Sequence, residues 1–157
     1  FPKTRVVLLK QYTYEGFIFY TNYESEKGKA ILANPHLCLS FFWPSLERQI
    51  IIKGIAEKVP ANTSDGYFDS RPLGSQLGAI VSPQSEVIPS REYLEEHLHA
   101  LEKQYEGKEV PRPEHWGGFL VRPQSLEFWQ GRPNRLHDRL RYTLTEDYDW
   151  KLERLAP

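Results

Sequence analysis

The chain has 157 residues, a length that fits one domain and lets a core form without disulfides or structural metals. Its 20 Lys and Arg residues against 21 Asp and Glu residues give a formal net charge of −1, so no overall field favours nucleic acid or an anionic membrane as a partner. A single cysteine excludes an intrachain disulfide and a cysteine-rich metal site, and every apolar run is shorter than the roughly 20 residues of a membrane-spanning helix.

Cys38 lies in the apolar run 37–42 and is interpreted as a core strand residue rather than a catalytic thiol. This cysteine usage favours a reducing compartment, so we expect a cytoplasmic protein, and we predict no metal site. The chain contains no methionine and starts at Phe1, directly before a predicted strand. We therefore expect a truncated or partly ordered N-terminus, before which a targeting peptide or a substrate-covering arm could have stood.

The first 59 residues predict two pairs of antiparallel strands with a short helix between them. The strands are expected at 4–10, 17–21, 37–43 and 48–59, and the helix at 25–33. Glu15 and Gly16 form the turn of the first pair, whereas Pro44 and Ser45 separate the second. Ser25 is a good N-cap for the helix.

The middle of the chain predicts helices and the last third returns to strands. Helical segments are expected at 63–71 and 73–81, split by Pro72, and at 90–105, capped by Ser90. Strands are expected at 116–121, 125–129, 136–144 and 150–154. Strands before and after a helical insert indicate an α+β fold built on an antiparallel barrel, in one domain over residues 1–157.

Residues near the N-terminus form a first candidate site, for a phosphate. Arg5 and Lys10 supply cations, Thr21 supplies a hydroxyl at a strand end, and Ser25 caps a helix whose N-terminus attracts anions. The alternative is that Arg5 and Lys10 are strand-edge charges and Ser25 is only a cap. In an unbroken strand residues 5 and 10 point to opposite faces, so they should serve different anions or different sides of one cleft.

A second candidate phosphate site consists of Tyr67, Arg71 and Ser75, which are spaced by four residues. In a continuous helix they would share one face and offer two hydroxyls and a guanidinium. Pro72 is expected to reorient Ser75. The alternative is a surface arginine beside a buried tyrosine.

A third group lies in the segment 127–139. In an extended chain Arg135, His137 and Arg139 alternate onto one side, a concentration of donors that calls for an anionic or electron-rich partner. The alternative is a solvated strand face, with Asp138 as an ordinary salt-bridge partner. The polar residues Gln49, Gln84 and Ser85 are weaker candidates for contacts with a heteroaromatic ring or a phosphate.

Over essentially its whole length the chain resembles the pyridoxamine 5′-phosphate oxidase family. The most specific match runs from Phe128-Trp129-Gln130-Gly131 into the segment 134–139. The segments 5–10, 19–22, 70–72, 82–85 and 153–157 support it. The resemblance implies an FMN-binding split β-barrel with flanking helices, assembled as a homodimer with two equivalent flavin sites at the subunit interface.

The resemblance also assigns site residues. It implies FMN contacts from Arg5, Val6, Val7, Leu8, Tyr20, Thr21, Lys27, Gln49, Gln84, Ser85, Trp129 and Arg139. It implies substrate contacts from Lys10, Tyr67, Arg71, Ser75, Arg135, Leu136 and His137. Where many family members have a second cation before the lysine, this chain has Glu26. The flavin phosphate should then depend more on Arg5, Lys27 and the helix N-terminus, and FMN affinity is expected to be lower.

The implied reaction transfers a hydride equivalent from the 4′ carbon of pyridoxamine or pyridoxine 5′-phosphate to FMN, and dioxygen then reoxidises the flavin to give hydrogen peroxide. Arg135 and His137 are the candidates for clamping the pyridine ring and handling protons. Two alternatives stay open: a non-catalytic protein that binds flavin or pyridoxal phosphate, and a split-barrel flavin reductase with a nicotinamide donor. No glycine-rich dinucleotide fingerprint is present.

Overall fold

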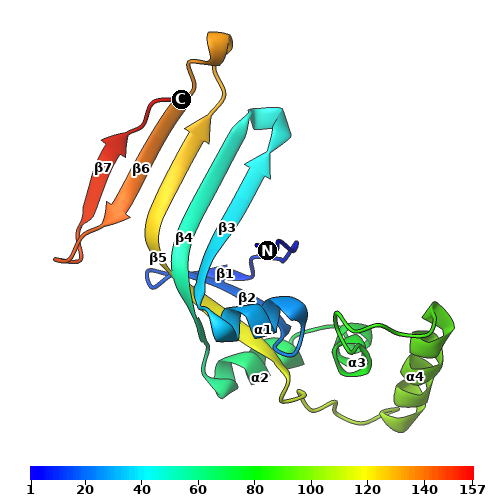
Figure 1. The fold of residues 1–157 in the computed structure, drawn as a ribbon. Coiled ribbons are helices and arrows are strands. Elements are labelled where there is room, and N and C mark those ends of the chain that lie inside the picture. Colours follow the sequence, from blue (N-terminus) through cyan, green and yellow to red (C-terminus); the bar gives the residue numbers. More distant parts are fainter.

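The computed structural model describes residues 1–157 as a curled antiparallel sheet with four helices at one of its ends (Figure 1). The strands are β1 (Gln11–Tyr12), β2 (Phe17–Asn22), β3 (His36–Trp43), β4 (Arg48–Lys58), β5 (Trp116–Gln130), β6 (Asp138–Leu144) and β7 (Trp150–Arg154). The helices are α1 (Glu26–Ala33), α2 (Ala61–Asp69), α3 (Leu73–Val81) and α4 (Arg91–Gln104). The single antiparallel sheet with helices inserted between its strands confirms the predicted α+β fold.

Strand β5 is the spine of the sheet. It pairs with β4 along most of its length, while its first half also pairs with β2 and its second half with β6. The sequence predicted two strands here, separated around Pro123, but the structure has one. The register against β4 shifts between Lys53 and Gly54, and Pro123 lies opposite Gly54. Because a bulge tolerates a residue without an N–H donor, the strand continues through the proline.

The helices begin and end where the sequence indicated, within about two residues. The Ser25 side chain accepts a hydrogen bond from the Gly28 N–H, and the Ser90 side chain accepts one from the Tyr93 N–H, so both predicted N-caps are confirmed. Pro72 ends the α2 segment and starts α3, because a proline fits the start of a helix and not its interior. This break brings α2 and α3 around one pocket.

Two hydrophobic clusters anchor the sheet and the helices to each other. Phe19, Phe119 and Val121 are buried between the strands. Phe68 of α2 and Leu77 of α3 pack with Trp116 at the start of β5. The second cluster fixes the helices against the end of the sheet where β2 and β5 meet, which is also the position of the candidate site.

The N-terminal residues correct one prediction. Residues 4–10 were predicted as a strand, but this segment has no strand pairing, and only the Lys10 N–H bonds across to the Ile18 carbonyl. Val6 is 97% exposed, whereas Val7 is partly buried against the cluster that contains Phe19 and Phe119. The expected alternation of Arg5 and Lys10 across a strand therefore does not apply.

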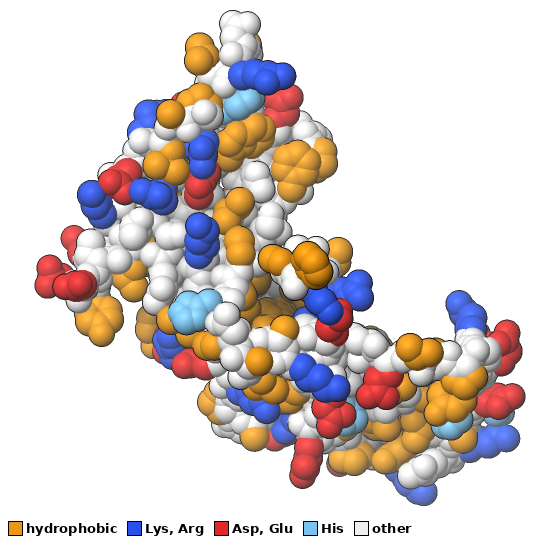
Figure 2. Space-filling model, in the orientation of Figure 1, with side chains coloured by type: hydrophobic (Ala, Val, Ile, Leu, Met, Phe, Trp, Pro, Cys, Tyr) orange, Lys and Arg blue, Asp and Glu red, His pale blue; other side chains and the backbone are white.

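Cys38 lies on β3 as predicted, but its side chain is exposed rather than in the core. The part of the sheet that extends away from the helices, here called the sheet arm, also exposes other apolar side chains, among them Phe42, Trp43 and Leu152. Figure 2 shows hydrophobic side chains on this arm, which meets the helical end at an angle and leaves a hollow between the two. No helix is long and apolar enough to cross a membrane.

Candidate functional site

The candidate site is a pocket of about 570 Å³ at the helical end of the sheet. Its walls come from the segment before β1, from β2 and the start of α1, and from α2, α3 and the turn that follows α3. Eleven predicted site residues line it, namely Val6, Val7, Leu8, Lys10, Tyr20, Thr21, Lys27, Tyr67, Arg71, Ser75 and Gln84. Three of the lining side chains are cationic and none is acidic, which suits an anionic ligand.

Lys27 and its neighbours form one polar corner of this pocket. The Lys27 ammonium donates to the Thr21 hydroxyl at 3.1 Å and to the Gln84 side-chain carbonyl at 3.2 Å. Burial lowers the pKa of Lys27, and the charge of nearby Arg5 lowers it further. Lys27 and Arg5 repel each other, and a bound oxyanion would relieve both this repulsion and the desolvation of Lys27. This corner is the candidate site for the flavin phosphate.

Arg71 forms the other cationic part of the pocket. One of its terminal nitrogens, Nη1, is buried and has no hydrogen-bond partner. Burial lowers the pKa of this guanidinium. Tyr67 and Ser75 line the same pocket, and the Lys10 ammonium lies 5.8 Å from the Tyr67 ring centre. A buried donor without a partner is costly, so this position fits a phosphate that would satisfy it.

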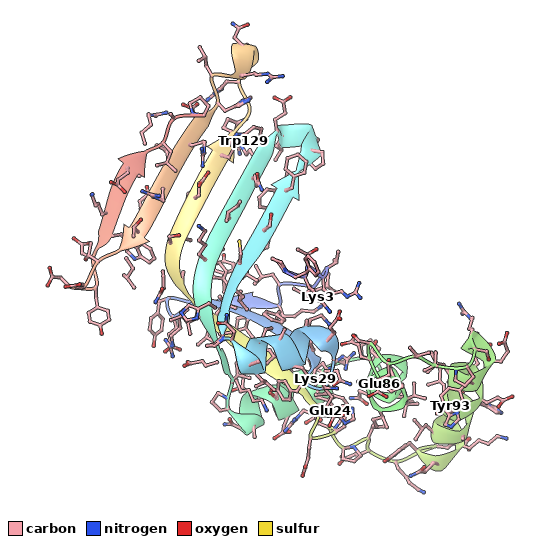
Figure 3. All side chains as sticks on the ribbon, viewed as in Figure 1. Lys3, Glu24, Lys29, Glu86, Tyr93 and Trp129 are labelled. Carbon is pink, nitrogen blue, oxygen red and sulfur yellow. The ribbon has the colours of Figure 1, made fainter.

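The segment before β1 covers part of the pocket through Val6, Val7 and Leu8. The Lys3 ammonium pairs with the Glu26 carboxylate at the start of α1. That contact, together with the charges of Lys3 and Arg5, lowers the pKa of Glu26. Glu26 thus takes part in an ion pair with the N-terminal segment, and it is not among the lining residues. Figure 3 shows Lys3 near α1.

The remaining predicted flavin contacts lie at the other end of the sheet. Gln49, Trp129 and Arg139 occupy one row, because Gln49 pairs with Trp129 and Trp129 pairs with Arg139. Figure 3 shows Trp129 at the end of the sheet distant from α1. The Arg139 guanidinium donates to the Glu127 carboxylate at 2.7 Å and to the Ala156 carbonyl at 2.9 Å. Some of the N–H donors of Arg139 therefore already have acceptors within the same chain.

The segment predicted to place Arg135, His137 and Arg139 on one strand face differs from that expectation. Residues Pro133–Arg135 form a 3₁₀ turn, and β6 begins only at Asp138. Arg135 has a φ of 61°, in the left-handed region, so the alternation fails before the strand starts. The prediction of a shared strand face was wrong, although His137 still lies beside Trp129, with ring centres 4.9 Å apart.

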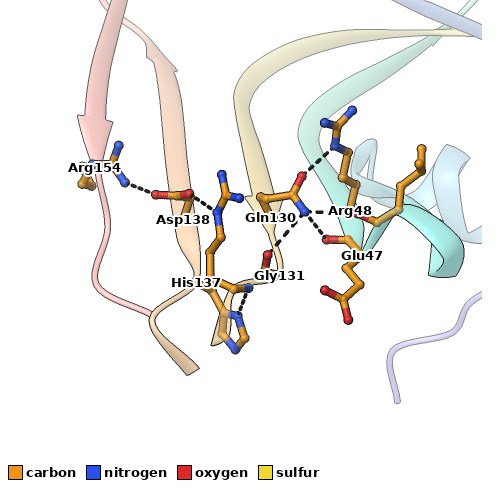
Figure 4. A network of polar contacts seen from close by, with 9 residues as sticks. Glu47, Arg48, Gln130, Gly131, His137, Asp138 and Arg154 are labelled. Carbon is orange, nitrogen blue, oxygen red and sulfur yellow. Dashed lines mark hydrogen bonds and ion pairs between the residues drawn. The ribbon is translucent and has the colours of Figure 1, made fainter. Parts of the chain in front are cut away.

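A network of polar contacts holds this turn in place (Figure 4). The Arg132 N–H donates to His137 Nδ1 at 3.1 Å, which leaves the other ring nitrogen of His137 free to face a ligand. Asp138 pairs with Arg132 at 2.8 Å and with Arg154 at 2.6 Å, as its predicted salt-bridge role requires. Leu136 is 71% exposed, and Arg135 forms no ion pair.

Within one chain, therefore, the predicted site residues form two groups. One group lines the pocket, and the other, consisting of Gln49, Trp129, Arg135, Leu136, His137 and Arg139, lies at the far end of the sheet. Ser85 belongs to neither: it is exposed in the turn after α3, with a φ of 76°. No group of three or more His, Cys, Asp or Glu side chains is arranged to hold a metal ion.

A smaller groove of about 380 Å³ crosses strands β4 to β7. Its charged side chains largely neutralise one another, since Glu153 pairs with Arg141 at 3.0 Å and with Lys151 at 2.8 Å. The groove holds mixed charges, whereas the pocket is cationic. The pocket is the better candidate for binding anionic ligands.

Several residues of the pocket wall were not predicted as site residues from the sequence, including Asn22, Ser82 and Trp116. Trp116 starts β5 and stacks with Tyr20, with ring centres 5.6 Å apart. Its position depends on packing between β2, β5 and α2, and no local pattern in the sequence signals such a contact.

The chain matches two family profiles that together span nearly all of it. Residues 2–105 match the profile described as pyridoxamine 5′-phosphate oxidase. Residues 116–157 match the profile described as the pyridoxine 5′-phosphate oxidase C-terminal dimerisation region. The second profile includes most of the far group of site residues.

Named relatives and solved structures agree with these profiles. A pyridoxine/pyridoxamine 5′-phosphate oxidase of Flavobacterium psychrophilum is 71% identical over 100% of this chain and 73% of its own length. The enzyme of that name from a Nostoc species is 53% identical over 99% of this chain and 73% of its own length. PhzG from Burkholderia lata, solved with tetrahydrophenazine-1-carboxylic acid, superposes with a TM-score of 0.92 at 30% identity, over 99% of this chain and 75% of PhzG.

A fold-level likeness extends further. A pyridoxamine 5′-phosphate oxidase-related, FMN binding protein of Nostoc punctiforme superposes with a TM-score of 0.74 at 14% identity, over 98% of this chain and 79% of that protein. At this identity the likeness concerns the fold alone.

Proposed function

Because the chain belongs to the pyridoxamine 5′-phosphate oxidase family, we propose that it oxidises pyridoxamine and pyridoxine 5′-phosphate to pyridoxal 5′-phosphate. FMN is the proposed cofactor, dioxygen the electron acceptor and hydrogen peroxide the second product. Membership of this oxidoreductase family makes the chain an enzyme. The particular substrates and acceptor are the subject of the proposal.

One observation carries the proposal: the pocket has two separate cationic places and no acidic side chain. Lys27 and its partners form one, and Arg71 with its partnerless Nη1 forms the other. The reaction needs two phosphorylated ligands at the same time, FMN and the substrate. Two anion sites within one pocket fit that requirement, whereas a site for a single anion would not.

The residues of the first place fit the flavin phosphate. Lys27 supplies charge, Thr21 and Gln84 supply polar contacts, and Arg5 adds a second cation. Val6, Val7 and Leu8 supply an apolar wall for the ring system. When bound, FMN supplies the two-electron acceptor for the 4′ carbon of the substrate, a step that no side chain of this protein can perform.

The residues of the second place fit the substrate phosphate. The Arg71 guanidinium offers a planar pair of donors, the hydroxyls of Tyr67 and Ser75 line the same wall, and Lys10 adds charge. Holding the phosphate there fixes the pyridine ring relative to the flavin site, so binding energy at a remote group helps to orient the reacting carbon.

The far group completes the site in a homodimer. A twofold dimer places the pocket of each copy against the far end of the sheet of the other, and so builds two equivalent sites from one interface. The match of residues 116–157 to a dimerisation region supports this arrangement. In it, Gln49, Trp129 and Arg139 contact the flavin, while Arg135 and His137 clamp the pyridine ring. An imidazole is suited to moving a proton near neutral pH.

A second candidate comes from the likeness to PhzG, which was solved with a carboxylic acid of a reduced tricyclic ring system. Such a ligand carries one carboxylate and no phosphate. Its carboxylate is itself an anion and can pair with Arg71 while the FMN phosphate lies at Lys27. The names of the relatives at 53–71% identity, all pyridoxine/pyridoxamine 5′-phosphate oxidases, favour the phosphorylated substrate.

The test is turnover by the purified protein. We expect a yellow protein that releases hydrogen peroxide with pyridoxamine phosphate or pyridoxine phosphate under air. Flavin reduction by a nicotinamide donor without response to these substrates would favour a reductase. Binding without turnover would favour a non-catalytic protein, and peroxide release only with tetrahydrophenazine-1-carboxylic acid would favour the second candidate.

A further inference from the structure

Arg71 differs from other partly buried arginines of this chain in what it contacts. Arg112 pairs with Asp65 at 2.6 Å, and Arg139 pairs with Glu127 at 2.7 Å. No acidic side chain lines the pocket of Arg71, and its guanidinium lies over two aromatic rings. Its guanidinium carbon lies 4.5 Å from the Trp116 ring centre and 5.7 Å from that of Phe68.

Trp116 is itself fixed by a stack of aromatic rings. Tyr20 and Tyr67 stack with ring centres 3.9 Å apart and an angle of 20° between their planes. Trp116 lies nearly parallel to both, at 5.6 Å from Tyr20 and 6.1 Å from Tyr67. Phe68 meets Trp116 edge to face at 5.3 Å. Trp116 is only 7% exposed, so this stack cannot rotate away from Arg71 without disturbing the core.

The kind of partner matters for anion binding. A carboxylate would attract the guanidinium but would also occupy its in-plane N–H donors and repel a phosphate. The face of an indole attracts the cation through its quadrupole and leaves the in-plane donors free. The unpartnered Nη1 of Arg71 matches this expectation, because it is a buried donor without an internal acceptor, on a side chain that lines the pocket.

We propose that Trp116 is a positioning residue for the substrate phosphate, holding the Arg71 guanidinium by its face so that its in-plane donors point at the phosphate. The inference rests on the proposed function and deepens it, since it assigns to the phosphate site a residue that makes no polar contact with the ligand. Trp116 acts through Arg71 alone. Its effect should therefore disappear when Arg71 is absent.

The experiment compares Trp116→Leu and Trp116→Phe with the wild type and with Arg71→Ala, all saturated with FMN. Trp116→Leu should raise the KM for pyridoxamine phosphate and the inhibition constant of inorganic phosphate by about threefold to thirtyfold, the size of a cation–π contact. Trp116→Phe, which keeps a smaller aromatic face, should give a smaller increase. FMN affinity should change less than phosphate binding, because Lys27 and its partners are not altered and Tyr20 keeps its stacking on Tyr67.

Core disruption is controlled with Phe119→Leu, which removes an equally buried aromatic ring outside the pocket. The decisive comparison is the double variant Trp116→Leu with Arg71→Ala. If the proposal holds, the second change adds no further loss of phosphate binding to Arg71→Ala. If Trp116→Leu does not fold, the same cycle is run with Trp116→Phe.

Three results overturn the inference: an effect of Trp116→Leu no larger than that of Phe119→Leu, an equal effect with and without Arg71, or a fall in kcat alone with phosphate binding intact. Failure of the proposed function looks different. There, the wild type does not turn over pyridoxamine phosphate, yet inorganic phosphate binding, measured by calorimetry on the FMN-saturated protein, still reports whether Trp116 acts through Arg71.

Discussion

The two ends of the sheet hold their charged side chains in opposite ways. At the helical end, Lys27 touches only neutral oxygens and Arg71 has a buried donor without a partner. At the far end, Arg132 and Arg154 share Asp138, and Arg139 is paired with Glu127. The pocket at one end thus has cations without carboxylates from its own chain, while three arginines at the other end are paired with carboxylates.

This difference indicates what each end does. Burying a cation without a nearby acid is unfavourable unless an anionic ligand compensates its charge, and this is why we propose the helical end as a binding site for anions. The paired charges at the far end hold a turn and a strand edge in shape, and they leave Trp129 and His137 to make the contacts. In the proposed site, the helical end contributes cationic side chains, and the far end contributes the rings of Trp129 and His137.

The largest expected effect comes from removing Arg71. Arg71→Ala should lower kcat/KM for pyridoxamine phosphate by about a hundredfold, since a charge-assisted hydrogen bond contributes up to about 3 kcal/mol. Arg71→Lys should recover part of the loss, because it keeps the charge without the planar fork. Steady-state kinetics with FMN occupancy checked by absorbance gives the result. Wild-type kcat/KM in Arg71→Ala would make this residue an ordinary surface arginine.

Removing the other cation should affect the flavin instead. Lys27→Ala should weaken FMN binding by about tenfold to a hundredfold while leaving the KM of the FMN-saturated enzyme unchanged. Lys29→Ala is the matched control, because Lys29 lies on the same helix with an exposed side chain outside the pocket. Flavin fluorescence on titration of the apoprotein measures both. Equal affinities in the two variants would remove Lys27 from the flavin site.

A smaller effect is expected from pH. The pKa of Lys27 is lowered by burial and by Arg5, so its charge is lost at a lower pH than that of an ordinary lysine. The charged form attracts the phosphate, so FMN affinity should hold below this pKa and fall as the pH rises through it. Lys27→Arg should keep its affinity to higher pH, because a guanidinium stays protonated. Identical pH profiles for the wild type and Lys27→Arg would contradict this account.

Much of the fold could be predicted from local patterns. The α3 helix starts directly after Pro72, and β7 spans the predicted residues, because both depend on neighbours along the chain. Residues 4–10 were mispredicted because β-branched residues indicate a strand, while actual pairing depends on a partner that this chain does not supply. Pro123 misled in the opposite direction: it indicates a break, but β5 continues through it, because the pairing with β4 skips Gln124 next to the proline.

The sequence predicted which types of residue line the candidate site, but it predicted their positions in space less well. The pocket unites Lys10 and Arg71, from the two predicted phosphate sites, with Lys27, which the family resemblance assigned. The placement of Arg135 and His137 on one strand face failed, because a left-handed residue ends the extended chain before β6. The role inferred for Trp116 arises from ring stacking between three elements and has no counterpart in a linear pattern.

The central claim is that each site takes its cationic pocket from one chain and its far-end residues from another. Complementation tests it directly. Two variants, Arg71→Ala in the pocket and His137→Ala at the far end, are each purified with little activity and then mixed under conditions that exchange subunits. In a mixed dimer one of the two sites has both wild-type halves, so random mixing should restore about a quarter of wild-type kcat per chain. If exchange is verified by mass spectrometry and activity does not rise above that of the separate variants, the site is built within one chain and the account is wrong.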